Sequence, residues 1–189
     1  GGTGFYTYSW NSDNGFAAST ENISNLSAGT YTLVVTDQNN CINDSTVIEI
    51  TEPEGIEINY TQSNYTDFGV SCNGASDGFI DITTTGGTGN YIFTWTADNG
   101  FTASIEDISN LSAGNYNLSV VDENDCPITL DVEITEPDPI EIVFTASNEN
   151  GFGVLCNGDS NGSIDVTVTG GTGVYTYSWT ADNGFTAST

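Results

Sequence analysis

Carboxylates and thiols are the most reactive side chains in this sequence. It contains 26 Asp and Glu residues and four Cys, with no Lys, Arg or His. A Ser-His-Asp triad, a lysine Schiff base and an arginine phosphate clamp therefore cannot be built. The chemistry that remains is a glycosidase with paired carboxylates, which needs one unique cleft. The acids instead recur with a sequence repeat, on turns and on outer faces of strands, so we expect no catalytic residues and no enzyme.

The four cysteines are of two kinds. Cys72 and Cys156 follow the opening strand of a repeat, whereas Cys41 and Cys126 precede its last strand. One of each kind per repeat favours one disulfide per repeat, Cys72 to Cys126, in an oxidising, extracellular setting. The alternative pairing, Cys41 to Cys72 and Cys126 to Cys156, would join neighbouring repeats. Without His or a Cys-x-x-Cys motif, no metal site is expected at the thiols.

Two loop motifs suggest ligand binding but are better interpreted as turns. Gly86-Gly-Thr-Gly89 has the glycines of a phosphate-binding loop, yet it joins strand to strand and no Lys follows. Asp37-Gln-Asn39 lacks the spacing and the terminal Glu of a calcium loop. We therefore expect no cofactor-binding residue and no metal ligand. We expect calcium to act only as a dissolved cation that screens the net charge of -26.

The uniform charge excludes two classes of partner. A surface without cations repels the phosphates of nucleic acids and the head groups of anionic membranes. No stretch approaches the roughly 18 consecutive apolar residues of a membrane helix. We expect no nucleic-acid binding and no membrane insertion by this segment.

The elements that carry these residues repeat along the chain. A Gly-Gly-Thr-Gly turn and an aromatic run occur three times, and each run ends in tryptophan: Trp10, Trp95 and Trp179. The spacing is 85 and then 84 positions, which is typical of an array of similar domains. We assign residues 1–52 to the C-terminal part of repeat 1, 53–137 to a complete repeat 2, and 138–189 to the N-terminal part of repeat 3. The same polypeptide is expected to complete the partial repeats.

Within repeat 2, apolar side chains alternate with polar ones. Tyr91, Phe93 and Trp95 lie two apart, so they share one face of a strand, which we expect to point inward. Leu111-Ser-Ala-Gly114 before Tyr116 resembles the tyrosine corner of immunoglobulin-like sandwiches, as does its twin before Tyr31. About seven strands without a helical period predict an all-β fold of tandem immunoglobulin-like (PKD-like) β-sandwich repeats of about 85 residues. The expected structural core includes Trp10, Trp95, Trp179, Tyr31 and Tyr116.

Several motifs in a fixed order give the chain a family resemblance. In repeat 2 they are Cys72-Asn-Gly74, Asp77-Gly-Phe-Ile-Asp81, the glycine turn with its aromatic strand, Leu111-Ser-Ala-Gly-Asn-Tyr116, Asp122-Glu-Asn-Asp-Cys126 and Ile134-Thr-Glu-Pro137. Together they resemble the SprB-type repeat over essentially the whole chain. That family builds giant surface adhesins of gliding Bacteroidetes, exported by the type IX secretion system. The resemblance implies an extracellular, cell-surface filament that serves attachment or gliding motility.

Two functions of different classes remain open. In the first, the tandem repeats are the stalk of a large adhesin and hold an adhesive region away from the cell. In the second, each repeat itself binds polysaccharide or another extracellular surface. Lateral self-association in a filament is a further expected interaction. Aromatic side chains exposed in every copy would favour binding, whereas buried ones would favour the stalk.

Overall fold

The structure is a computed structural model that describes residues 4–188. These residues form fifteen β-strands and no helix. Accordingly, no helix among them is long and apolar enough to cross a membrane. The chain divides into two compact units, Gly1–Gly55 and Ile56–Thr189. The assignment of residues 1–52, 53–137 and 138–189 to three repeats stays a prediction.

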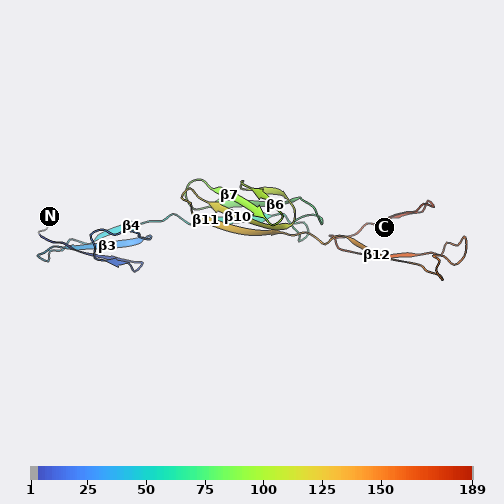
Figure 1. Ribbon diagram of the computed structural model, residues 1–189, viewed down its shortest axis with the longest axis horizontal. Helices are drawn as coiled ribbons and strands as arrows, with labels where there is room; N and C mark the ends of the chain where they lie inside the picture. The colour runs from blue at the N-terminus through green and yellow to red at the C-terminus, as the bar shows by residue number, and fades with distance from the viewer. Residues whose placement is uncertain (1–3, 189) are drawn as a thin grey trace. The chain divides into compact units, whose positions relative to one another are not determined.

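Repeat 2 is a sandwich of two antiparallel sheets, seen in the green and yellow part of the ribbon (Figure 1). One sheet has the strand order β5-β6-β9 and the other β11-β10-β7-β8. The bounds are β5 Glu57–Gln62, β6 Gly78–Thr85, β7 Ile92–Ala97, β8 Thr102–Ala103, β9 Ile108–Leu111, β10 Gly114–Val121 and β11 Pro127–Ile134. Seven strands that cross between two sheets in this way form an immunoglobulin-like β-sandwich, so the predicted fold class is confirmed.

Alternation along the strands creates the core between these sheets. On β6, Ile80 and Ile82 are buried, whereas Phe79 points outward and is 40% exposed. In the facing sheet, β10 pairs with β7 so that Leu118 lies opposite Trp95. Ile80, Ile82, Trp95 and Leu118 belong to one apolar cluster, against which Tyr91 and Phe93 pack. The aromatic strand of repeat 2 therefore faces inward, as its spacing predicts.

The first unit contains one four-stranded antiparallel sheet of order β2-β1-β3-β4. Its strands are β1 Thr7–Ser12, β2 Ala17–Ala18, β3 Gly29–Thr36 and β4 Thr46–Ile50. They correspond to β7, β8, β10 and β11 of repeat 2. Trp10 and Tyr31 are buried, but Ile48 on β4 is 39% exposed, whereas its counterpart Val132 in repeat 2 is 3% exposed. This sheet has no second sheet over its inner face among the described residues of the unit.

The last part of the second unit contains two two-stranded sheets, β12-β13 and β14-β15. Their strands are β12 Glu141–Ala146, β13 Ile164–Thr169, β14 Ser178–Thr180 and β15 Thr186–Ser188. They correspond to β5 to β8 of repeat 2, and up to residue 188, where the description ends, no strand corresponds to β9, β10 or β11. As a result Ile164 is 57% exposed, although its counterpart Ile80 is fully buried.

Candidate functional site

The joint that leaves repeat 2 is held against the sandwich. Asn73 Nδ2 donates a hydrogen bond to the carbonyl oxygen of Pro137 at 3.1 Å. The backbone N–H of Gly74 donates to Glu136 Oε2 at 2.6 Å. Pro137 itself is fully buried. The Glu-Pro joint is thus an ordered extension of the repeat rather than a free linker.

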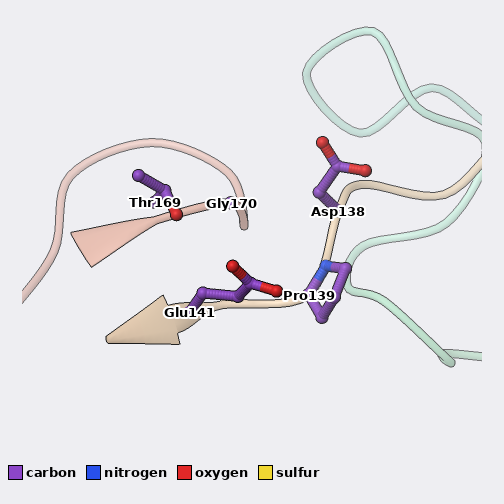
Figure 2. A pocket seen from close by; sticks show the side chains of 5 residues that line it. All are labelled: Asp138, Pro139, Glu141, Thr169 and Gly170. Atoms are coloured by element: carbon purple, nitrogen blue, oxygen red, sulfur yellow. The ribbon is translucent and has the colours of Figure 1, made fainter. Parts of the chain in front are cut away.

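A small hollow follows this joint (Figure 2). Its volume is about 230 Å³, and it is lined by Asp138, Pro139, Glu141, Thr169 and Gly170. Gly170 has a φ of +77°, and a Cβ there would collide with the carbonyl oxygen of Pro139, so the turn requires glycine. Across residues 4–188, no three His, Cys, Asp or Glu side chains come together where they could hold a metal ion. With two carboxylate side chains and no cationic side chain, the lining of the hollow does not favour an anion such as phosphate.

Asp122 organises the opposite end of repeat 2. Its carboxylate accepts hydrogen bonds from the backbone N–H groups of Asn124 and Cys126, both at 2.9 Å. It also accepts from the N–H of Thr88 at 2.9 Å and from Thr88 Oγ1 at 3.0 Å. These donors, the N–H of Cys126 foremost, hold the pKa of the Asp122 carboxyl below its usual value. Asp122 therefore ties the β10–β11 hairpin to the glycine turn.

The Asp-Asn-Gly turn is tied to the tyrosine corner. Asn99 Nδ2 donates to the hydroxyl of Tyr116 at 3.0 Å and to the carbonyl oxygen of Ala113 at 3.2 Å. The Tyr116 hydroxyl in turn donates to the carbonyl oxygen of Ser112 at 2.8 Å. The predicted corner therefore forms, and the Asn-Gly turn supports it.

The first unit repeats this network with its own residues. Asn14 Nδ2 donates to the Tyr31 hydroxyl at 3.2 Å, and that hydroxyl donates to the carbonyl oxygen of Ser27 at 2.8 Å. Asp37 accepts from the N–H groups of Asn39 and Cys41, both at 2.9 Å. The recurring Asp and Asn residues are therefore used to build turns and hairpins.

The hydrogen-bonded aspartates predict how stability depends on pH. Hydrogen bonds are the main reason why four carboxyls have a lowered pKa. The donor residue is Thr30 for Asp13, Ser71 for Asp77, Asn115 for Asp98 and Cys126 for Asp122. A lowered pKa in the folded state adds stability above the unfolded pKa of about 4, and this stability is lost as pH falls through the folded value. Thermal unfolding should therefore move to lower temperature below about pH 4. A melting temperature that keeps rising as the pH is lowered below about 4 would contradict this.

The predicted disulfide between Cys72 and Cys126 is not formed; all four cysteines are free and exposed. The two thiols lie at opposite ends of β11. Cys126 immediately precedes that strand, whereas the segment before Cys72 meets its far end, because Gly69 N–H donates to the carbonyl oxygen of Thr135 at 2.9 Å. An eight-residue strand spans about 27 Å, and a disulfide needs Cα atoms within about 7 Å. The pairing was wrong because it ignored which end of the sandwich each loop occupies.

We expect no Cys72–Cys126 bond in the folded chain. Non-reducing peptide mapping should recover both cysteines alkylated after treatment with iodoacetamide. The Asp122 charge raises the pKa of the Cys126 thiol, so Cys126 should react faster once Asp122 is replaced by asparagine. A peptide pair joined through Cys72 and Cys126 would show that the strand order of repeat 2 is wrong.

The predicted core residues lie in three different environments. Trp95 and Tyr116 are fully buried in repeat 2, and Trp10 and Tyr31 are buried in the first unit. Trp179 is only half-buried. Asp122 is part of the Asp122-Glu-Asn-Asp-Cys126 motif, but its sequence context assigns it no role, and nothing in the sequence marks Asn99 as the partner of Tyr116. The available signal is recurrence: Asp37 and Asp122 each stand four residues before a Cys, and Asn14, Asn99 and Asn183 each follow an Asp.

The comparisons with known proteins agree with the repeat. The family model described as SprB repeat matches residues 69–100 and 154–184. These matches confirm the predicted SprB-type repeat. No curated protein matches the sequence. The solved structure of the amphioxus IgVJ-C2 molecule is similar over 69% of this chain and 88% of its own, at 19% identity and a TM-score of 0.35. The strand order of repeat 2, rather than that likeness, identifies the fold.

Proposed function

We propose, from the premise that this chain carries SprB-type repeats, that it is a stalk segment of a large extracellular adhesin. The stalk holds an adhesive region away from the cell surface, for attachment or gliding motility. It acts without catalysis and without a cofactor.

The observation that carries this proposal is the direction of the aromatic strand. Trp95 is fully buried, and Tyr91 and Phe93 pack against the core. The most distinctive motif of the repeat is therefore used for folding and is not presented to a ligand. The ordered joint at Glu136 and Pro137 supports the same role, since a stalk needs defined connections.

A binding role for each repeat is the second candidate, and one observation favours it. Tyr60 is 45% exposed in repeat 2, and an aromatic residue, Phe144, stands at the corresponding position of the next repeat. Aromatic rings at matching positions of successive repeats would provide stacking platforms for sugar rings. Under this alternative the partner is an extracellular polysaccharide.

Scattering and binding experiments distinguish the two roles. A stalk with like charge on every repeat should give an extended profile in small-angle scattering at low salt and shorten as salt rises. The net charge of -26 makes this effect large. A compact profile at low salt would contradict the stalk. Polysaccharide binding that is lost in Tyr60→Ala and Phe144→Ala, but kept in the outward-facing control Phe79→Ala, would instead establish the binding module.

A further inference from the structure

Three consecutive residues at the end of repeat 2 are hydrogen-bonded to one loop of that repeat. The carbonyl oxygen of Thr135 accepts from two backbone N–H groups of the segment 69–74, at 2.9 and 3.1 Å. The bonds to Glu136 and to the carbonyl oxygen of Pro137, described above, come from the same segment. Repeat 2 therefore holds the chain up to and including the carbonyl group of Pro137.

The next two residues contact the glycine turn of repeat 3. The backbone N–H of Gly171 donates to the carbonyl oxygen of Asp138 at 2.8 Å. The carbonyl oxygen of Pro139 lies so close to Gly170 that a Cβ on this glycine would be 2.0 Å from it (Figure 2). Residues 135–139 are thus engaged without a gap, first by repeat 2 and then by repeat 3.

Asp138 is the one point of freedom between these two sets of contacts. The peptide plane that contains the Pro137 carbonyl is bonded to repeat 2, and the plane that contains the Asp138 carbonyl is bonded to repeat 3. Since peptide units are planar, only the φ and ψ of Asp138 can change the connection. The ring of the following Pro139 clashes with most other conformations, and so confines Asp138 to extended backbone.

The joint before repeat 2 differs at the position of Pro139. Residues 53–55 are Pro-Glu-Gly, whereas residues 137–139 are Pro-Asp-Pro. A Cβ added to Gly55 would meet no neighbouring atom, so close packing does not explain the glycine. Without a following proline, Glu54 is not confined to extended backbone, and Gly55 itself is permissive in both dihedrals.

We propose that the residue at this position sets the stiffness of each joint. Pro139 makes the connection between repeats 2 and 3 stiff, and Gly55 makes the connection before repeat 2 a hinge. An array with both kinds of joint bends at the glycine joints and moves as one body across the proline joints. This inference holds whether the repeats form a stalk or bind a ligand.

Electron spin resonance on the full chain tests the proposal through its own cysteines. Cys72 and Cys156 are exposed and occupy matching positions of repeats 2 and 3, so each can carry a spin label once Cys41 and Cys126 are replaced by serine. Double electron–electron resonance then measures the distribution of distances between the labels. Pro139→Gly should at least double the width of this distribution, because it releases Asp138 from the extended region.

The matched control is Pro127→Gly, which makes the same substitution at the exposed first residue of β11, away from the joint. It should leave the width unchanged. Amide hydrogen exchange in β12 and β13 should be the same with Pro139 and with Gly at that position, which separates a looser joint from unfolding of repeat 3.

The reciprocal change is Gly55→Pro, measured with labels on Cys41 and Cys126 and with the other two cysteines replaced by serine. It should narrow the distribution of distances between these labels, since Glu54 is then followed by proline. A width between Cys72 and Cys156 that does not change in Pro139→Gly would overturn the proposal. So would a width between Cys41 and Cys126 that does not fall in Gly55→Pro.

Discussion

Replacing Trp95 with alanine should lower the free energy of unfolding of repeat 2 by about 3–5 kcal/mol. The Trp95 side chain is fully buried in the cluster between the two sheets. Its indole Nε1 also donates to the carbonyl oxygens of Ile105 at 3.1 Å and Glu106 at 3.2 Å. The substitution therefore leaves a cavity and two carbonyls without this donor. Urea denaturation followed by far-ultraviolet circular dichroism measures the loss.

The matched control is Trp179→Ala, which removes the same side chain from a half-buried position outside repeat 2. It should leave the unfolding transition of repeat 2 unchanged. If Trp95→Ala cost less than about 1 kcal/mol, the aromatic strand would not be the centre of the core.

Tyr116→Phe should cost repeat 2 about 1–3 kcal/mol. The ring would still pack, edge-on to Phe101 with ring centroids 5.5 Å apart. Only the hydroxyl is lost, which donates to Ser112 and accepts from Asn99. The carbonyl oxygen of Ser112 would then lose a buried partner. The same denaturation measurement detects the change.

Tyr60→Phe is the control for this prediction, since the Tyr60 side chain is 45% exposed and its loss of a hydroxyl should stay within about 0.5 kcal/mol. A double-mutant cycle with Asn99→Ala should give a coupling energy of at least about 0.5 kcal/mol with Tyr116→Phe, because the two side chains share a hydrogen bond. Strictly additive effects would show that the turn and the corner are independent.

The sandwich could be predicted because strand alternation and turn chemistry are local. Ile80 and Ile82 alternate with polar residues, and glycine turns bound the strands on either side. The burial of Trp95 follows from the same pattern. The partial exposure of Trp179 does not, since its motif is nearly the same as that of Trp95. The difference arises because strands that cover Trp95 have no counterpart beside Trp179 in the described residues.

The cysteine pairing could not be predicted, because it depends on strand direction in three dimensions. Spacing placed Cys72 and Cys126 in one repeat, but it did not reveal that β11 separates them along its whole length. The role of Asp122 could not be predicted either, because it also depends on contacts between distant parts of the sequence. Its bond to Thr88 joins residues 34 positions apart, and only the folded hairpin brings them together.

The path of the chain through repeat 2 determines how the repeat would respond to pulling. The chain enters beside Gly87 and Asp122, since a Cβ on Gly87 would lie 2.8 Å from Ile56 and 3.0 Å from the Asp122 carboxylate. It leaves by the far end of β11, past the joint at Pro137. Tension between neighbouring repeats therefore acts along the first and last strands.

Those two strands are hydrogen-bonded along their length. β5 pairs with β6 over six positions, and β11 pairs with β10 over eight. Hydrogen bonds between antiparallel strands lie perpendicular to the strands. A force along the strands thus loads the bonds of each ladder together in shear, whereas a force across them would open the bonds one at a time. A repeat connected in this way resists mechanical extension until a whole ladder fails at once.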